Sequence, residues 1–207
     1  MVRVVAVVMV ALVSLSAAQA APARTVVALR LDGVVDPFEA SYLTSQIHAA
    51  GDAGASAVLI TIDTPGGLDS SMREIVQAIL NSPLPIVCYV SPDGARAASA
   101  GTFILTACDI AAMAPGTNVG AASPVGVSGA TEQQKVMNDA AAYIRSLAEQ
   151  KGRNAGWAER AVTQAISASA QEALRLNVID LVASNQADLL SRIDGRNITK
   201  NGRSLTI

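Results

Sequence analysis

Ser99 is the residue of this sequence that is best placed to act as a nucleophile. It lies in the run Gly-Ala-Arg-Ala-Ala-Ser-Ala-Gly at residues 94–101, where a polar loop leads into an alanine-rich helical stretch. The N-terminus of a helix stabilises negative charge through its dipole and its unpaired backbone N–H groups. Serine is also a common helix N-cap. The small residues on both sides of Ser99 leave room for the backbone of another chain, which favours the nucleophile.

A pair of glycines earlier in the chain could stabilise the charge that such a reaction creates. The run Asp-Thr-Pro-Gly-Gly at residues 63–67 directly follows an apolar stretch at residues 57–62. Consecutive glycines let the backbone turn sharply and approach a ligand closely, so their N–H groups could form part of an oxyanion hole. An ordinary turn between a strand and a helix would also explain this motif, because Gly and Pro are the usual turn residues.

A serine nucleophile needs a general base, and histidine is a weak candidate for that role in this sequence. The single histidine, His48, has no acidic residue at a position that indicates a Ser-His-Asp triad, so we interpret it as a structural residue. A lysine can act as the base if its pKa falls toward neutrality, and the chain offers Lys135, Lys151 and Lys200. We expect Lys135 in the first turn of a helix, where the helix dipole favours the neutral amine. The alternative for Lys135 is a solvated surface side chain.

The elements that must position these residues alternate between strands and helices. Four apolar runs predict buried strands, at residues 26–31, 57–62, 86–90 and 110–114. Helical spacing of apolar residues predicts a helix at 36–50, with Pro37 at its first position, and another between Gly67 and Asn81. This alternation implies an α/β fold with a largely parallel sheet. In such a sheet, active sites lie at the carboxyl ends of the strands.

The second half of the chain is predicted to be mostly helical. Thr131 and Gln134 form a capping box that would begin a helix ending near Gln150. The aperiodic stretch at residues 115–130, rich in Gly, Ser, Thr and Pro, predicts a long loop of functional importance. Residues 204–207 have the pattern of a strand.

Composition limits the function classes that need to be considered. The 207 residues suffice for one domain with a sizeable core, and 51% of them are hydrophobic. The net charge of −2 gives no electrostatic basis for binding nucleic acid.

Residues 1–20 are interpreted as a signal peptide, with a mature domain at residues 21–207. A short apolar stretch follows Arg3, and Ala18-Gln19-Ala20 fits the small-x-small cleavage pattern. An uncleaved membrane anchor and a buried core segment are the alternatives, although the stretch is shorter than the ~20 residues of a typical spanning helix. We therefore expect an exported, extracytoplasmic domain.

The two cysteines, Cys88 and Cys108, both lie inside apolar stretches. Free cysteine packs as a small hydrophobic residue, so we favour buried free thiols. Export would permit a disulfide as the alternative. Neither cysteine has the spacing of a metal site.

Several of these motifs together resemble a known family. The runs at residues 63–67, 94–101 and 116–122 look like the N-terminal protease domain of NfeD-type membrane serine proteases, which belong to the ClpP/crotonase fold group. Weaker similarity continues at residues 135–139, 167–174 and 178–180, so the resemblance covers about residues 25–198. It implies a ClpP/crotonase-like α/β fold with repeated β-β-α units, a largely parallel sheet and a helical second half.

The resemblance implies a Ser–Lys dyad rather than a triad. Ser99 would attack the scissile carbonyl after Lys135 takes its proton, and the backbone N–H groups of Gly67 and Ala100 would hold the oxyanion. No metal and no cofactor would take part. The substrate peptide would be bound along Gly66, Gly67, Leu68, Ala121 and Ala122.

The resemblance also implies partners and a location. The expected substrates are hydrophobic segments of membrane proteins such as stomatin-like partners, and the expected assembly is a homodimer or a larger homo-oligomer. Full-length relatives commonly carry membrane-spanning helices and a small β-barrel domain after the protease. Because residues 21–207 contain neither, we expect either a piece of a longer membrane-associated protein or a short secreted version.

Two other function classes fit part of this pattern. A crotonase-type acyl-CoA enzyme would use the same paired N–H groups to hold a thioester oxyanion. A catalytically inactive scaffold would bind hydrophobic peptide without cleaving it. Loss of Ser99 labelling by a fluorophosphonate and turnover of an apolar peptide would distinguish these classes from a protease.

Overall fold

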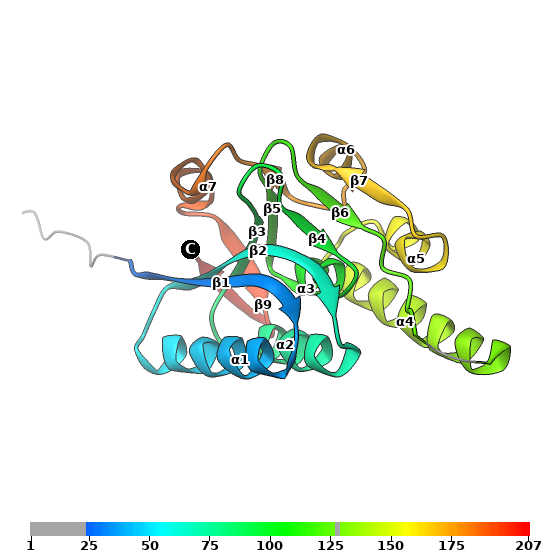
Figure 1. Ribbon diagram of the computed structural model, residues 1–207. Coiled ribbons are helices and arrows are strands. Elements are labelled where there is room, and N and C mark those ends of the chain that lie inside the picture. Colours follow the sequence, from blue (N-terminus) through cyan, green and yellow to red (C-terminus); the bar gives the residue numbers. More distant parts are fainter. Residues whose placement is uncertain (1–23, 127–128) are drawn as a thin grey trace, which may run out of the picture.

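The computed structural model describes residues 24–126 and 129–207, and its centre is a curled sheet (Figure 1). The expected signal peptide, residues 1–20, lies outside the described residues. Across the sheet the strands follow the order β7 (Ser167–Ser169), β6 (Asn118–Gly120), β4 (Arg96–Ala98), β2 (Ala57–Gly67), β3 (Ile86–Val90), β5 (Ile110–Met113) and β8 (Leu181–Val182). The strand β1 (Val26–Val35) also pairs with β2. All of these pairs are parallel except β6–β7, so the expected α/β fold with a largely parallel sheet is confirmed.

Helices cover both faces of the sheet. The helices are α1 (Pro37–Asp52), α2 (Asp69–Asn81), α3 (Ala100–Ala107), α4 (Ala130–Gln150), α5 (Ala155–Thr163), α6 (Ala170–Arg175) and α7 (Gln186–Ile193). In Figure 1, α1 and α2 lie below the sheet and α7 lies above it. Val58 and Ile60 of β2 pack in a larger core with α1 and α2, while Leu59 packs in a smaller core with Leu189 of α7. Successive side chains of a strand point to opposite faces, so burial of both faces explains the uninterrupted apolar runs of the sequence.

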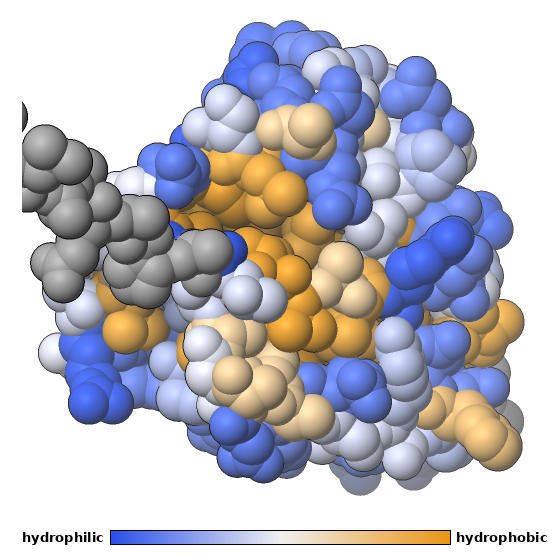
Figure 2. Space-filling model, turned by 90° about the vertical axis from the view of Figure 1, so that its left-hand side faces the viewer, coloured by the Kyte–Doolittle hydropathy of each residue, from blue (hydrophilic) through white to orange (hydrophobic). Residues whose placement is uncertain are grey.

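A hairpin of β9 (Asn197–Lys200) and β10 (Arg203–Thr206) ends the chain and confirms the expected strand near residues 204–207. Ile198 of this hairpin and Ile207 after it pack on the smaller core. Figure 2 looks onto the left-hand side of Figure 1 and shows apolar side chains across the middle of this face, with polar ones around them.

The end of β2 differs from the turn expected at residues 63–67. The strand continues through Gly67, which pairs with Val35 of β1. A Cβ on Gly67 would lie 2.1 Å from the carbonyl oxygen of Val35, so glycine lets the two backbones approach this closely. The extra strand residues carry Gly66 and Gly67 past β3 to the neighbourhood of β4, where Thr64 pairs with Ala97.

The expected start of α4 and the expected long loop are also wrong in detail. The helix begins at Ala130, with Gly129 at the N-cap and no side-chain cap bond, so Thr131 lies inside the helix and forms no capping box. The stretch at residues 115–130 contains β6, which pairs with β4 and β7. Short strands such as β6 gain their partners only in the folded chain, and periodicity over three residues is too short to reveal them.

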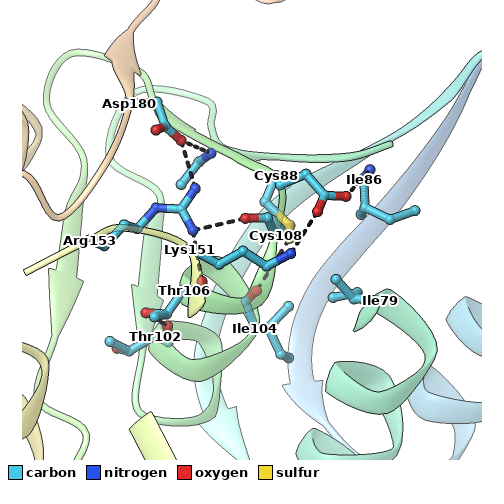
Figure 3. Close-up of a disulfide and its surroundings, with 12 residues drawn as sticks. Ile79, Ile86, Cys88, Thr102, Ile104, Thr106, Cys108, Lys151, Arg153 and Asp180 are labelled. Carbon is cyan, nitrogen blue, oxygen red and sulfur yellow. Dashed lines mark hydrogen bonds and ion pairs between the residues drawn. A yellow bond between two sulfur atoms is a disulfide. The ribbon is translucent and has the colours of Figure 1, made fainter. Parts of the chain in front are cut away.

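Cys88 and Cys108 form a disulfide, so the favoured prediction of free thiols is wrong. Cys88 lies in the middle of β3, and Cys108 directly follows α3. The helix returns the chain to the sheet, which brings the two Cα atoms within 5.9 Å across a sequence separation of 20. This distance lies in the usual range for disulfides. The bond therefore ties the C-terminal end of α3 to the central strand (Figure 3).

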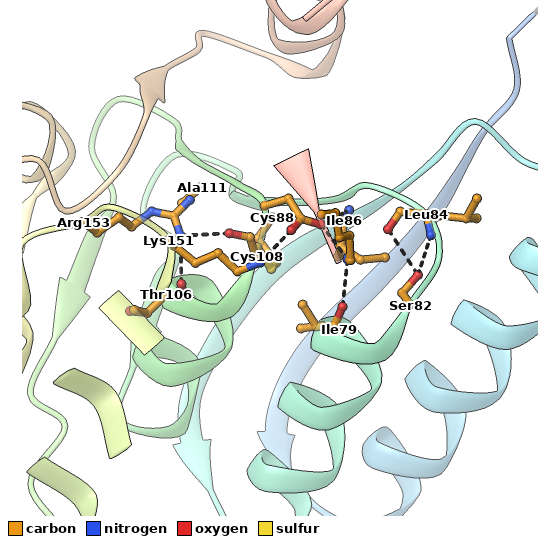
Figure 4. A network of polar contacts seen from close by, with 12 residues as sticks. Ile79, Ser82, Leu84, Ile86, Cys88, Thr106, Cys108, Ala111, Lys151 and Arg153 are labelled. Atoms are coloured by element: carbon orange, nitrogen blue, oxygen red, sulfur yellow. Dashed lines mark hydrogen bonds and ion pairs between the residues drawn. A yellow bond between two sulfur atoms is a disulfide. The ribbon is translucent and has the colours of Figure 1, made fainter. Parts of the chain in front are cut away.

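A buried carboxylate beside the disulfide joins two lysines. The Asp109 oxygens each lie 2.6 Å from a lysine Nζ, one from Lys151 after α4 and the other from Lys200 of β9. Asp109 also accepts a hydrogen bond from the backbone N–H of Ile86, and Lys200 donates to the carbonyl of Ile79 at the end of α2 (Figure 4). Burial lowers the pKa of Lys200, and the attraction of Asp109 opposes this shift.

Arg153 binds the C-terminal end of α3. Its guanidinium donates to the carbonyl oxygens of Thr106 and Cys108 at 2.8 Å and pairs with Asp180 at 2.6 Å. A cation at the C-terminus of α3 is stabilised by the helix dipole. We refer to the disulfide, Asp109 with its two lysines, and Arg153 as the helix-end anchor.

Candidate active site

One pocket of about 500 Å³ brings together residues that are far apart in the sequence. It lies where β2, the N-terminal ends of α2 and α3, and α4 meet. Its lining includes six residues with an expected role in the chemistry or in peptide contact: Gly67, Leu68, Ser99, Ala100, Ala122 and Lys135. The pocket therefore contains both residues of the expected dyad and both residues of the expected oxyanion hole.

Ser99 lies at a sharp turn between β4 and α3. Its backbone angles, φ 51° and ψ −116°, are costly for a residue other than glycine. Its N–H donates to the carbonyl of Gly120 at 3.0 Å, and its carbonyl accepts from the N–H of Thr102 at 2.9 Å, which holds this conformation. The side chain makes no cap bond to the helix, so the hydroxyl is not a structural cap. A strained strand-to-helix turn of this kind exposes a nucleophile above the sheet.

Two glycines make room for this turn. A Cβ on Gly66 would lie 2.5 Å from the Cβ of Ser99 and 3.0 Å from its Oγ, and the φ of Gly66 is +110°. A Cβ on Gly101 would lie 2.5 Å from Cγ2 of Thr64. Thr64 is fully buried, and its Oγ1 accepts a hydrogen bond from the N–H of Gly66 at 3.0 Å. The end of β2 and the start of α3 therefore fit together only because both carry glycine.

The two residues of the expected oxyanion hole lie beside Ser99. Ala100 is the first residue of α3, and the N–H groups of the first helical turn have no partner within the helix. Gly67 is the last residue of β2, and the following N–H, of Leu68, is occupied by the carbonyl of Val35 at 2.8 Å. Successive N–H groups of a strand point to opposite sides, which directs the N–H of Gly67 away from β1.

Lys135 differs from the other two lysines of the chain. Its side chain is exposed and lines the pocket, whereas Lys151 and Lys200 are both held by Asp109. Because α4 begins at Ala130, Lys135 lies in the second turn of the helix. The prediction that it lies in the first turn is therefore wrong. The field of a helix terminus acts within the first turn, so the dipole argument for a neutral amine does not apply here.

His48 lies on the exposed side of α1 and does not line the pocket. This agrees with its interpretation as a structural residue. Among the described ranges 24–126 and 129–207, no group of His, Cys, Asp and Glu side chains could hold a metal ion. No helix in the same ranges combines the length and the apolar character needed to cross a membrane.

The expected peptide contacts are only partly in the pocket lining. Gly67, Leu68 and Ala122 line it, and the Leu68 side chain is 52% exposed. Gly66 and Ala121 directly precede Gly67 and Ala122 in the chain but do not line the pocket. The N–H groups of Ala121 and Ala122 are bound to carbonyls of Ile166 and Ala161, which fixes this segment next to α5.

Several pocket residues were not predicted from the sequence. Met72 of α2, Phe103 of α3 and Val136 of α4 give the pocket an apolar wall. Arg73 and Asp139 add a charged part to it. Helical spacing could have suggested two of these residues, since Phe103 follows Ser99 by four residues and Asp139 follows Lys135 by four residues.

The chain is similar in sequence to a known protein family and to two curated proteins. The family model of the NfeD1b N-terminal domain matches residues 25–195. The membrane-bound protease PH1510 of Pyrococcus horikoshii is 38% identical over 185 residues, which are 86% of this chain and 42% of that protein. The membrane protein NfeD1b of Bacillus subtilis is 33% identical over 135 residues, which are 65% of this chain and 30% of that protein. The chain thus spans less than half the length of these curated relatives.

Solved structures agree with these matches. A variant of the stomatin-specific membrane protease 1510-N, with a serine replaced by alanine, has a TM-score of 0.83 and 37% identity, covering 88% of this chain and 92% of that one. A lysine-to-alanine variant of 1510-N in complex with a substrate peptide has a TM-score of 0.83 and 36% identity, covering 90% and 88%. ClpP1 from Listeria monocytogenes, at 19% identity and a TM-score of 0.66, covers 78% and 94%. The fold is therefore ClpP-like.

Proposed function

The chain belongs to the family of the NfeD1b N-terminal domain, and from this premise we propose that it is a serine endopeptidase with a Ser99–Lys135 dyad. The observation that carries the proposal is the shared pocket. Ser99, at a strained turn, and Lys135, on a separate helix, line one cavity together with Gly67 and Ala100. Relatives that are named as proteases support the same reaction class.

The proposed mechanism follows from the chemistry of these groups. The neutral amine of Lys135 accepts the proton of the Ser99 hydroxyl as its Oγ attacks the scissile carbonyl. The N–H groups of Gly67 and Ala100 donate hydrogen bonds to the oxyanion of the tetrahedral intermediate. The ammonium of Lys135 then protonates the leaving amine, and an ester between Ser99 and the acyl group remains. Water attacks this ester with Lys135 again as the base, which releases the acid and restores Ser99.

The proposed substrate is an extended peptide with an apolar side chain near the cleaved bond. Its backbone would lie between the segment Gly66–Leu68 and the segment Ala121–Ala122. The apolar wall formed by Met72, Phe103 and Val136 would accept the side chain. The similar 1510-N protease is described as stomatin-specific and binds a substrate peptide, which supports a stomatin-like membrane protein as the substrate class here.

We place this reaction outside the cytoplasm and next to a membrane. The support is the apolar, signal-like segment at residues 1–20 of the sequence and the membrane-bound character of the two curated relatives. Self-association as a homodimer or larger homo-oligomer remains part of the proposal.

A fluorophosphonate probe tests the nucleophile. We expect the wild-type protein to be labelled at Ser99 and the Ser99→Ala variant to lose both labelling and cleavage of an apolar peptide. Ser45→Ala is the matched control, because Ser45 is an exposed serine of α1 outside the pocket. Labelling that persists in Ser99→Ala would refute the serine mechanism. Peptide binding without any turnover by the wild type would favour an inactive scaffold instead.

A further inference from the structure

The part of α4 that carries Lys135 is the part least embedded in the protein. None of residues 130–139 is buried, whereas Ala140, Ala141, Ile144 and Leu147 are all buried. In Figure 1, α4 extends to the lower right, past the sheet. Full burial therefore begins one residue after Asp139, and before it Met137 is a partly buried side chain that packs against the larger core. With so little core packing, the start of the helix gains a defined place from another contact.

Arg73 of α2 provides such a contact. Its Nη2 forms a hydrogen-bonded ion pair with Oδ2 of Asp139, and its Nε forms another with Oδ2 of Asp69 at 2.8 Å. Its Cζ lies 4.5 Å from the centre of the Tyr143 ring, a cation–π distance. Arg73 thus touches α4 at two positions four residues apart, which lie on one face of a helix. Lys135 lies one turn before Asp139 on that same face.

The same contact connects α4 to the helix of the nucleophile. The ring of Tyr143 stacks on the ring of Phe103, with the centroids 6.0 Å apart and an interplanar angle of 28°. Phe103 lies in α3, one turn after Ser99. One chain of contacts therefore leads from Arg73 through Tyr143 and Phe103 to the helix that begins at Ser99, while the other leads from Arg73 through Asp139 toward Lys135.

We propose that Arg73 is a positioning residue, which holds the start of α4 so that Lys135 faces Ser99. The inference rests on the proposed Ser99–Lys135 chemistry. Its physical basis is the fork of the guanidinium, which can bind two carboxylates and an aromatic face at once. Because an exposed ion pair of this kind adds little to overall stability, its consequence is the placement of the base and not the stability of the fold.

The test compares Arg73→Met with wild type in peptide hydrolysis. We expect kcat to fall about 10- to 100-fold, because small displacements of a catalytic group are costly, with KM nearly unchanged. The thermal midpoint should move by no more than about 3 °C. Arg145→Met is the matched control. Arg145 also lies on α4 and pairs with Glu159 at 3.2 Å, with its side chain 44% exposed, but it lies outside the pocket. This control should retain wild-type kcat.

Two further measurements separate positioning from other roles of Arg73. In the Lys135→Met background, Arg73→Met should cause no additional loss, because the base that it positions is already absent. In amide hydrogen exchange, Arg73→Met should accelerate exchange in residues 130–139 and leave residues 140–150 unchanged.

Three results would overturn the positioning role. A rise in KM alone would make Arg73 a substrate contact, and an equal loss in the Lys135→Met background would place its effect elsewhere. Unchanged exchange in residues 130–139 would show that it does not hold the helix start. If Lys135→Met itself cleaves as fast as wild type, the proposed dyad fails, and the exchange experiment still decides whether Arg73 holds α4.

Discussion

The C-terminal ends of helices α3 and α4 are fixed by strong contacts, whereas their N-terminal ends face a pocket. At their C-terminal ends, the helix-end anchor joins them to the sheet and to each other through the disulfide, Asp109 and Arg153. At their N-terminal ends, Ser99 and Lys135 face a pocket, and the hydroxyl of Ser99 makes no cap bond. The two lysines at the ends of α4 show the contrast directly, since Lys135 is exposed and the Lys151 side chain is only 12% exposed and ion-paired.

The firmly held C-terminal ends support the strained turn at Ser99. A residue with φ 51° persists only if the surrounding structure determines its conformation. The covalent bond and the buried charges lie at the ends of the helices where no chemistry is proposed. The polar groups at the other ends then remain available for a substrate. We therefore expect the C-terminal ends to govern stability and the N-terminal ends to govern catalysis.

The largest expected effect separates the two lysines of α4. Lys135→Met should lower kcat/KM by about 10²- to 10⁴-fold, the usual contribution of a general base, and leave stability nearly unchanged. Lys151→Met should keep the catalytic rate but lower the free energy of unfolding by about 1–3 kcal/mol, because it removes one partner of a buried carboxylate. Peptide hydrolysis and urea unfolding of both variants give the answer. Equal catalytic losses in the two variants would contradict the contrast.

The disulfide should matter for stability more than for chemistry. It closes a loop with a sequence separation of 20, for which chain entropy predicts a contribution of about 3 kcal/mol. We expect that urea unfolding after reduction gives a free energy lower by this amount, while fluorophosphonate labelling of the folded, reduced protein at Ser99 stays near the wild-type rate. The double variant Cys88→Ala/Cys108→Ala is the control and should not respond to reductant. A labelling rate that collapses while the protein remains folded would show that the anchor also controls the nucleophile.

The smallest expected effect is a pH dependence that comes from Lys200. Burial lowers the pKa of Lys200 below its ordinary value of 10.5. Between the lowered pKa and 10.5 the unfolded state binds more protons than the folded state, so stability due to this group rises with pH in that window. The slope has an upper limit of about 1.4 kcal/mol per pH unit for one proton. Below both pKa values the full cost of the buried charge is present.

Lys200→Met should remove this rise. Urea unfolding of wild type and variant, measured in steps up to pH 10.5, gives the difference between their stabilities. Burial also raises the pKa of Tyr89 and of Tyr143, but both tyrosines are present in the two proteins, so their contributions cancel. A parallel pH dependence of the two proteins would mean that Lys200 titrates alike in the folded and unfolded states.

Local sequence patterns predicted four of the strands of the sheet and the candidates for the chemistry. Apolar runs buried on both faces, such as residues 86–90, predicted strands that the structure confirms. Ser99, with small neighbours at the start of a helix, and the glycine pair before α2 could be singled out because glycine permits sharp turns and small side chains permit close approach. Local patterns of this kind depend on neighbours in the chain, so they can be recognised without the fold.

Contacts between distant residues became visible only in the folded chain. Cys88 and Cys108 looked like separate buried thiols, since nothing local shows that α3 returns its end to β3. Arg73 and Asp139 are 66 residues apart, and Lys200 and Asp109 are 91 apart, so neither pair could be recognised from spacing. The physical reason is that such contacts depend on how whole helices and strands pack, and packing adds constraints that no short stretch of sequence contains.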